Sequence, residues 1–230
     1  MSDPAKHGVS PRWRVVATGP WDRPGWSSIL EAGGCEVIVG TTFDQSPGPC
    51  YNEDQLIDLL HDADAALVSS RDAITAKVLQ NLPRLNLVAK ATIGVEKIDR
   101  AAATELGILV VNSPAPENFL GVAEATVGLM ISLAKRVNEN QRRVREGKWK
   151  APGSLGSLLL GKTVGIIGLG RVGMNVAKRL SGFGVRLIAA DPYVEPAMAF
   201  AVGVELVTLD ELVREADFIT CHVTLTPETR

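Results

Sequence analysis

The chain has 230 residues, 46% of them hydrophobic and 22% charged, and its formal net charge is −2. This composition is typical of a folded globular protein, and the near-zero charge gives no electrostatic reason to expect nucleic acid or an anionic membrane as a partner. No uninterrupted apolar run reaches the roughly 18 residues of a membrane span, because the most apolar stretch, 119–134, contains Glu124 and Ser132. Since the chain lacks a signal-peptide pattern and its three cysteines lack zinc spacing, we expect a cytoplasmic protein without a metal site.

Short apolar segments alternate with helix-like segments through the first part of the chain. The expected strands are 14–18, 36–39, 65–68, 85–90 and 108–111, and the expected helices are 27–32, 53–60, 77–82 and 98–106. Asn52 is expected to cap the second of these helices. Such alternation predicts a parallel sheet that is covered by helices on both faces.

A segment with two prolines, residues 112–116, interrupts this alternation and is a candidate crossing between domains. We therefore expect one domain over residues 12–112 and a second over residues 113–230. One long helix is expected from about 118 to 147, with apolar core positions in its first half and many charges in its second. Those apolar positions are Val122, Val127, Met130, Ile131, Leu133 and Ala134. Glu124 among them is either a buried functional carboxylate or a hydrogen-bonded structural residue.

The most informative stretch is 163–180, where an apolar strand runs into the pattern G-x-G-x-x-G and then into a helix. Gly168 permits a tight turn, Gly170 lets the backbone approach a pyrophosphate, and Gly173 allows close packing of helix and strand. The N–H groups at the start of such a helix favour a bound diphosphate. The alternative is a turn that only closes a βα unit, and the pattern alone would be weak. The strand before it and the helix after it favour a dinucleotide site.

An acidic residue completes this pattern. The next expected strand, 186–190, leads to Asp191, which lies about 20 residues beyond the last glycine. A carboxylate at this position accepts hydrogen bonds from the 2′-OH of an adenosine ribose. Pro192 and Tyr193 follow it, so no adjacent arginine is present to bind a 2′-phosphate. The sequence therefore predicts NAD, not NADP, as the cofactor.

Residues 217–222 are expected to form the third strand of this domain, with His222 at its carboxyl end. Ligands bind at the carboxyl ends of strands in such sheets. His222 is therefore either a catalytic acid/base or a cofactor-side or structural histidine near the adenine, and we favour the second interpretation. Cys221 is expected to be a small core residue.

Four groups of residues occur in the order found in one enzyme family. They are 91–99 with 107–112, 122–124 with 144–149, 160–173 with 182–184 and 191–192, and 217–222 with 225–229. On these motifs the chain resembles the D-isomer-specific 2-hydroxyacid dehydrogenases, most closely their phosphoglycerate dehydrogenase branch. The resemblance extends from about residue 12 to residue 230.

The resemblance implies an α/β protein with two doubly wound parallel-sheet domains. The first would be a flavodoxin-like substrate domain, and the second a Rossmann-like NAD-binding domain that this chain contains incompletely. The implied reaction is NAD-dependent oxidation of a D-2-hydroxy acid, or reduction of a 2-oxo acid. The long helix, which leads to Trp149, resembles the arm through which members of the family form homodimers.

The resemblance also assigns ligand contacts residue by residue. The backbone of Gly94 and Val95 would face the substrate carboxylate. Together with the glycine pattern, the resemblance assigns cofactor contacts to Gly168, Gly170, Arg171, Val172, Gly173, Asp191, His222 and Val223.

Three positions depart from the family pattern. Ser69 stands where the phosphoglycerate branch usually has a substrate-binding arginine, and Ile93 stands where that branch usually has a polar residue in contact with the cofactor. Thr224 replaces a proline that commonly follows the strand-end histidine by two residues. These departures argue against 3-phosphoglycerate as the substrate.

No residue of this chain is assigned a catalytic role. The family's catalytic arginine, glutamate and histidine lie downstream of the motif at 225–229, and the sequence ends at Arg230. We therefore expect the chain as given to lack turnover. The alternative function is that of a non-catalytic, NAD-binding regulatory or structural protein with the same fold.

Overall fold

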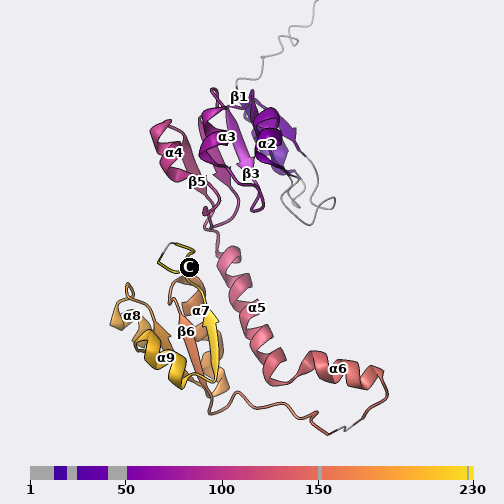
Figure 1. Cartoon of the computed structure of the whole chain (residues 1–230), viewed down its shortest axis with the longest axis vertical. Coiled ribbons are helices and arrows are strands. Elements are labelled where there is room, and N and C mark those ends of the chain that lie inside the picture. Colours follow the sequence, from indigo (N-terminus) through magenta and orange to yellow (C-terminus); the bar gives the residue numbers. More distant parts are fainter. Residues whose placement is uncertain (1–12, 20–24, 41–50, 150–151, 227) are drawn as a thin grey trace, which may run out of the picture. The chain divides into compact units, whose positions relative to one another are not determined.

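The computed structural model describes residues 13–19, 25–40, 51–149, 152–226 and 228–230 (Figure 1). The chain divides into two compact units, Met1–Ala115 and Pro116–Arg230, which are described separately below. The boundary expected at residue 12 lies outside the described residues.

The first unit contains a parallel five-stranded sheet with helices in the connections between its strands (Figure 1). Its strands are β1 (Trp13–Ala17), β2 (Cys35–Val39), β3 (Ala65–Val68), β4 (Leu87–Lys90) and β5 (Leu109–Asn112). Its helices are α1 (Trp26–Ala32), α2 (Glu53–Leu60), α3 (Ala76–Gln80) and α4 (Arg100–Glu105). The strand order β2-β1-β3-β4-β5 reverses direction between β1 and β3, which is the flavodoxin-like form of a doubly wound sheet. The predicted fold class is confirmed for this unit.

The core of the first unit lies on the central strands. Parallel pairing aligns Ala66 of β3 with Val16 of β1 and Val88 of β4, and all three residues are buried. Leu56 and Leu60 of α2 belong to the same hydrophobic cluster. Burial of these apolar side chains removes the central strands from water, as expected for a sheet covered on both faces.

The second unit is built on a parallel four-stranded sheet (Figure 1). Its strands are β6 (Thr163–Ile167), β7 (Arg186–Ala190), β8 (Val204–Leu206) and β9 (Phe218–Cys221). Its helices are α5 (Pro116–Ala134), α6 (Val137–Arg145), α7 (Arg171–Leu180), the 3-10 helix η2 (Ser181–Phe183), α8 (Pro196–Ala201) and α9 (Leu209–Glu215). The order β8-β7-β6-β9 is that of a Rossmann sheet with a fourth strand added beside the first. The strand predicted over residues 217–222 is present as β9, but it is the fourth strand of this unit and not the third, because the short strand β8 precedes it.

The prediction of one helix over residues 118–147 was also wrong. This segment forms two helices, α5 and α6, which are separated at Arg136, where φ is 52° and lies in the left-handed region. A later segment takes the place of the next helical turn: the Ser157 N–H donates to the Ala134 carbonyl at 2.7 Å, and the Lys135 ammonium donates to the Ser157 carbonyl at 2.9 Å. The last carbonyls of a helix have no partner within the helix. Here Ser157, from the loop after α6, supplies a donor for the carbonyl of Ala134.

Only one face of α5 is buried, where it packs against α7. The buried residues are Ala123, Val127, Met130 and Ala134. Val122 and Leu133 were expected in the core and are exposed. By length and composition α5 could cross a membrane, although 22% of its most apolar window is buried within the protein. Glu124 in its middle is exposed and pairs with the Arg179 guanidinium of α7 at 2.9 Å, so it is structural and not buried.

Candidate nucleotide-binding site

The glycine pattern forms the turn between β6 and α7. Gly168 follows the strand with a φ of 88°, which glycine adopts without the steric cost of a Cβ. A Cβ at Gly173 would collide with the Gly168 carbonyl oxygen, so α7 approaches the turn more closely than any other residue at 173 would allow. Among the described residues, no heavy atom lies within 4 Å of a Cβ built at Gly170, so the backbone there faces open space. The turn combines a tight bend, close helix packing and an accessible stretch of backbone.

The first turn of α7 offers hydrogen-bond donors to an anion. Gly170 is the N-cap of this ten-residue helix, and within the described chain no side chain caps it. The first N–H groups of a helix have no partner within the helix, and the helix dipole favours negative charge beside them. Arg171 and Val172 are the first residues of α7; Arg171 is exposed, and Val172 is half-buried against the core. A diphosphate over Gly170 would meet these N–H donors.

Asp191, directly after β7, is tied to the same turn. One oxygen of its carboxylate accepts the Leu169 N–H at 2.8 Å, and the other accepts the N–H groups of Tyr193 at 2.8 Å and Val194 at 3.2 Å. A carboxylate has about four acceptor sites, so capacity remains for a ribose hydroxyl. Asp191 therefore both fixes the residue between the first two glycines and leaves an acceptor for a nucleotide.

The end of β9 closes the other side of the turn. β9 pairs with β6, and the His222 N–H donates to the Ile167 carbonyl at 2.8 Å. A Cβ at Gly168 would lie 2.8 Å from Val223 Cγ1 and 3.0 Å from the His222 carbonyl oxygen. The strand order reverses between β6 and β9, and ligands of doubly wound sheets bind at such a reversal. The sheet thus brings the predicted residues 168–173, Asp191, His222 and Val223 together at its carboxyl edge.

His222 is half-buried, and this burial lowers the pKa of its imidazole. Its Nε2 lies 2.9 Å from the hydroxyl of Thr220, a contact that the sequence analysis missed. The signal was available, because residues two apart on a strand share a face. Cys221, between them, is exposed, so its expected place in the core was wrong. A strand at the edge of the described sheet leaves alternate side chains uncovered.

The residues expected at the substrate lie in the first unit, in the loop between β4 and α4. The Asn112 amide donates to the Ile93 carbonyl at 2.7 Å, and the Ile98 N–H donates to the Val95 carbonyl at 3.0 Å. Val95 is half-buried against the core, and a Cβ at Gly94 would collide with the Glu96 carboxylate. The loop is therefore held from β5 at Ile93, the residue before Gly94, and Gly94 itself is covered by one exposed, flexible side chain.

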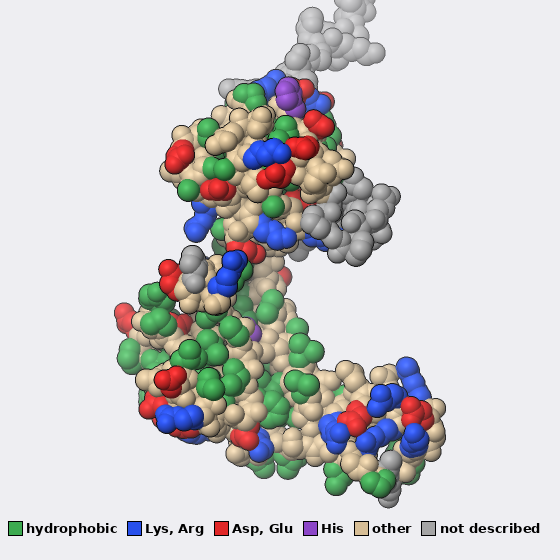
Figure 2. All heavy atoms as spheres, in the orientation of Figure 1, with side chains coloured by type: hydrophobic (Ala, Val, Ile, Leu, Met, Phe, Trp, Pro, Cys, Tyr) green, Lys and Arg blue, Asp and Glu red, His purple; other side chains and the backbone are tan. Residues whose placement is uncertain are grey.

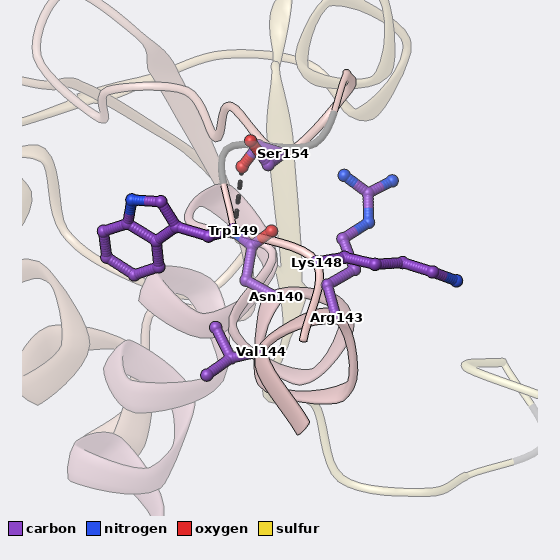
Figure 3. Close-up of a pocket in the computed structure, with 6 residues that line it drawn as sticks. All are labelled: Asn140, Arg143, Val144, Lys148, Trp149 and Ser154. Carbon is purple, nitrogen blue, oxygen red and sulfur yellow. Dashed lines mark hydrogen bonds between the residues drawn. The ribbon is translucent and has the colours of Figure 1, made fainter. Parts of the chain in front are cut away.

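A separate hollow of about 220 Å³ lies beside α6 (Figure 3). The Trp149 ring lies on one side of it, and the Arg143 and Lys148 side chains extend on the other. Both cations are paired, Arg143 with Glu139 at 2.9 Å and Lys148 with Glu146 at 2.8 Å. The hollow contains no described residue of the glycine turn and is not part of the nucleotide site.

The glycine turn, the acidic residue after β7 and the strand reversal define the second unit as a Rossmann-type dinucleotide-binding domain. Residues 127–230 match the family model for the NAD binding domain of D-isomer specific 2-hydroxyacid dehydrogenases. The chain belongs to the D-isomer-specific 2-hydroxyacid dehydrogenase family, and its cofactor is NAD.

Named relatives agree with this assignment. Over 218 residues the chain is 38% identical to D-3-phosphoglycerate dehydrogenase of Methanocaldococcus jannaschii, a match that covers 94% of this chain and 40% of the relative. The TT0316 protein from Thermus thermophilus is similar over 94% of this chain and 66% of its own, with 32% identity and a TM-score of 0.81. D-lactate dehydrogenase from Aquifex aeolicus, complexed with NAD and lactic acid, is similar over 94% of this chain and 62% of its own, with 28% identity and a TM-score of 0.78. The chain thus spans two fifths of the length of this curated relative.

Proposed function

We propose that the protein is an NAD-dependent oxidoreductase that acts on the CH–OH group of a D-2-hydroxy acid, or reduces the corresponding 2-oxo acid. The observation that carries this proposal is the glycine turn with Asp191 at the strand reversal, in a chain of the 2-hydroxyacid dehydrogenase family. When bound, NAD would accept the hydride that leaves carbon 2 of the hydroxy acid. The chain's own residues would bind and orient the cofactor and the substrate.

Each residue of the nucleotide site has a proposed task. The N–H groups of Arg171, Val172 and Gly173 donate to the diphosphate, which approaches over the open backbone of Gly170. Asp191 accepts a hydrogen bond from the adenosine ribose. The backbone of His222 and the side chain of Val223 lie against Gly168 and border the cofactor from the β9 side. The lowered pKa keeps the His222 imidazole neutral near pH 7, which suits a cofactor-side residue better than a permanent cation.

The substrate site is proposed to lie in the first unit, with residues 12–112 as the substrate domain and 113–230 as the NAD-binding domain. The N–H groups of Gly94 and Val95 would bind the substrate carboxylate, and the Asn112 amide would hold this loop through the Ile93 carbonyl. For binding, the Glu96 carboxylate must turn away from Gly94, which it can do because it is exposed.

We propose no catalytic residue within residues 1–230. The alternative, an NAD-binding regulatory or structural protein, keeps the same nucleotide site and differs only in turnover. A fold cannot separate these two functions.

We further propose that the protein forms a homodimer through α5 and α6. Apolar side chains of α5 are exposed, including Leu129 at 66% and Leu133 at 71%, and so is Trp149 shortly after α6, at 77%. Hydrophobic side chains gather along α5 in Figure 2. Exposed apolar surface of this extent is typical of an interface between subunits.

The proposal is tested in two steps. Calorimetric titration of residues 1–230 should give NAD binding, and a 2-oxo acid should shift the amide resonances of Gly94 and Val95. The gene should then be read beyond the codon for Arg230. If it encodes the family's arginine, glutamate and histidine, its product should oxidise D- but not L-2-hydroxy acids with NAD. Binding of NAD with no response at Gly94 to any 2-oxo acid would instead support the non-catalytic alternative.

A further inference from the structure

Four polar side chains are buried at the carboxyl edge of the first sheet. Thr18 directly follows β1, Ser69 directly follows β3, Lys90 ends β4, and Asp72 lies in the loop after β3. Their exposed fractions are 0%, 1%, 3% and 1%, respectively. Because β1, β3 and β4 are neighbours in the sheet, this buried polar cluster lies at the reversal of strand order, where doubly wound sheets bind ligands.

Hydrogen bonds within the buried polar cluster leave one acceptor unused. The Ser69 N–H donates to the Thr18 hydroxyl at 2.9 Å, and the Ser69 hydroxyl donates to Asp72 Oδ2 at 2.8 Å. The Ser69 hydroxyl also accepts the Arg71 N–H at 3.1 Å. Asp72 Oδ1 is buried and has no hydrogen-bond partner among the described residues. A buried carboxylate oxygen without a donor is costly, so its retention calls for an explanation.

The buried polar cluster adjoins the loop that holds Gly94. The Ser70 and Thr92 hydroxyls lie 3.4 Å apart, and the Lys97 ammonium donates to the Arg71 carbonyl at 3.0 Å. The Ile74 N–H donates to the Lys97 carbonyl at 2.9 Å, so the two loops run side by side. A small ligand whose carboxylate is bound at Gly94 would therefore extend its other end along the loop that contains Asp72.

We propose that Asp72 Oδ1 accepts a hydrogen bond from a hydroxyl or ammonium group at the far end of the substrate, so that this site selects donor-bearing 2-oxo or 2-hydroxy acids over phosphorylated ones. The Ser69 hydroxyl gives its only proton to Asp72 and cannot donate to a phosphate. The carboxylate of Asp72 repels a phosphate and attracts a donor. The inference rests on the proposed function, because it uses Gly94 as the carboxylate site.

Nuclear magnetic resonance titration of the full 230-residue chain tests this inference with three probes: pyruvate, 3-hydroxypyruvate and the 3-phosphate ester of 3-hydroxypyruvate. We expect 3-hydroxypyruvate to bind at least about tenfold more tightly than pyruvate, because a hydrogen bond to a charged group discriminates to this degree. We expect the phosphate ester to bind most weakly, and the amides of Ser69 and Arg71 to shift only with 3-hydroxypyruvate.

The substitution Asp72→Asn keeps an acceptor for Ser69 and turns the unpartnered position into an amide donor. It should remove the preference for 3-hydroxypyruvate over pyruvate and strengthen binding of the phosphate ester. Asp58→Asn makes the same change of charge at an exposed position of α2 and should alter none of the three affinities. If Asp72→Asn fails to fold, the three wild-type affinities decide the question alone.

Different failures have different meanings. Wild-type binding of the phosphate ester as tightly as 3-hydroxypyruvate, or equal binding of 3-hydroxypyruvate and pyruvate, would overturn the inference and leave the proposed function intact. Absence of any shift at Gly94 with all three probes would overturn the proposed substrate class, and the inference with it.

Discussion

Gly170 and Gly173 are three residues apart in one turn, yet the structure predicts opposite consequences for replacing each with alanine. A Cβ at Gly173 would collide with the Gly168 carbonyl oxygen and lie 3.2 Å from Ile166 Cγ2, so either the helix or the turn must shift. Forcing a methyl group into a packed region costs about 1–3 kcal/mol. We expect Gly173→Ala to lose about this much stability and to distort the NAD site as well.

Gly170→Ala should separate binding from folding. Its φ of −77° is accessible to alanine, and its Cβ would meet no atom of the described residues within 4 Å. The free energy of unfolding should therefore change by less than about 0.5 kcal/mol. The same methyl group would occupy the space through which a diphosphate approaches the backbone. Loss of one charge-assisted hydrogen bond, about 1.5–3 kcal/mol, predicts NAD binding weakened by roughly ten- to a hundredfold.

The assay pairs urea unfolding, followed by circular dichroism, with calorimetric titration of NAD for each variant. Gly182→Ala is the control, because Gly182 lies in the same unit, is exposed and also has no described atom near its Cβ position. It should leave both measurements unchanged. Wild-type NAD affinity in Gly170→Ala would refute the placement of the diphosphate, and equal stability loss in Gly170→Ala and Gly173→Ala would refute the packing argument.

Four further predictions follow from the same structure. NAD should bind at least about tenfold more tightly than NADP, since a 2′-phosphate would meet Asp191; equal affinities in calorimetry would contradict this. Hydrogen bonds from the Arg14 N–H and the Arg84 guanidinium lower the pKa of Asp64 below its ordinary 3.8. The ionised carboxylate therefore stabilises the folded state above pH 3.8, and this stabilisation is lost as the pH falls through the lowered pKa. In Asp64→Asn, the urea concentration at the unfolding midpoint should decline less steeply below pH 3.8 than in the wild type. Sedimentation at micromolar concentration should show a dimer, and a monomer throughout would overturn the proposed role of α5 and α6. Residues 1–230 should form no NADH from any D-2-hydroxy acid, and His222→Ala should change nothing; activity that this substitution abolishes would make His222 catalytic.

Local rules predicted those elements whose ends are marked by side chains. The Asn52 cap before α2 is an example: its side chain accepts the Gln55 N–H at 2.9 Å, and the Gln55 side chain accepts the Asn52 N–H at the same distance. The strand β6, which is apolar and directly precedes Gly168, was equally evident, because the glycine turn has a fixed relation to its flanking elements. In both cases the information lies within a few residues of the element.

The misplaced elements depend on distant residues or on very few residues. α5 ends at Ala134 because Ser157, from a later loop, takes its carbonyl, and nothing near Ala134 in the sequence marks this contact. β8 has three residues, too few for a period-two pattern, and exists because it pairs with β7. The unpartnered oxygen of Asp72 is another such case, because only the packed fold shows which donors Ser69 has already used.

Both sheets have a reversal of strand order, where doubly wound sheets bind ligands, but the two reversals offer different chemical groups. The reversal lies between β1 and β3 in the first sheet and between β6 and β9 in the second. At the second reversal the groups offered are backbone N–H donors around Gly170, and donors bind a diphosphate. At the first reversal one buried acceptor of the described side chains, Asp72 Oδ1, has no partner, and an unprotonated phosphate has no hydrogen to donate to it. The N–H groups of Gly94 and Val95 are the proposed donors for a carboxylate in this unit, so a ligand that also satisfied Asp72 would need a hydrogen-bond donor of its own at its other end.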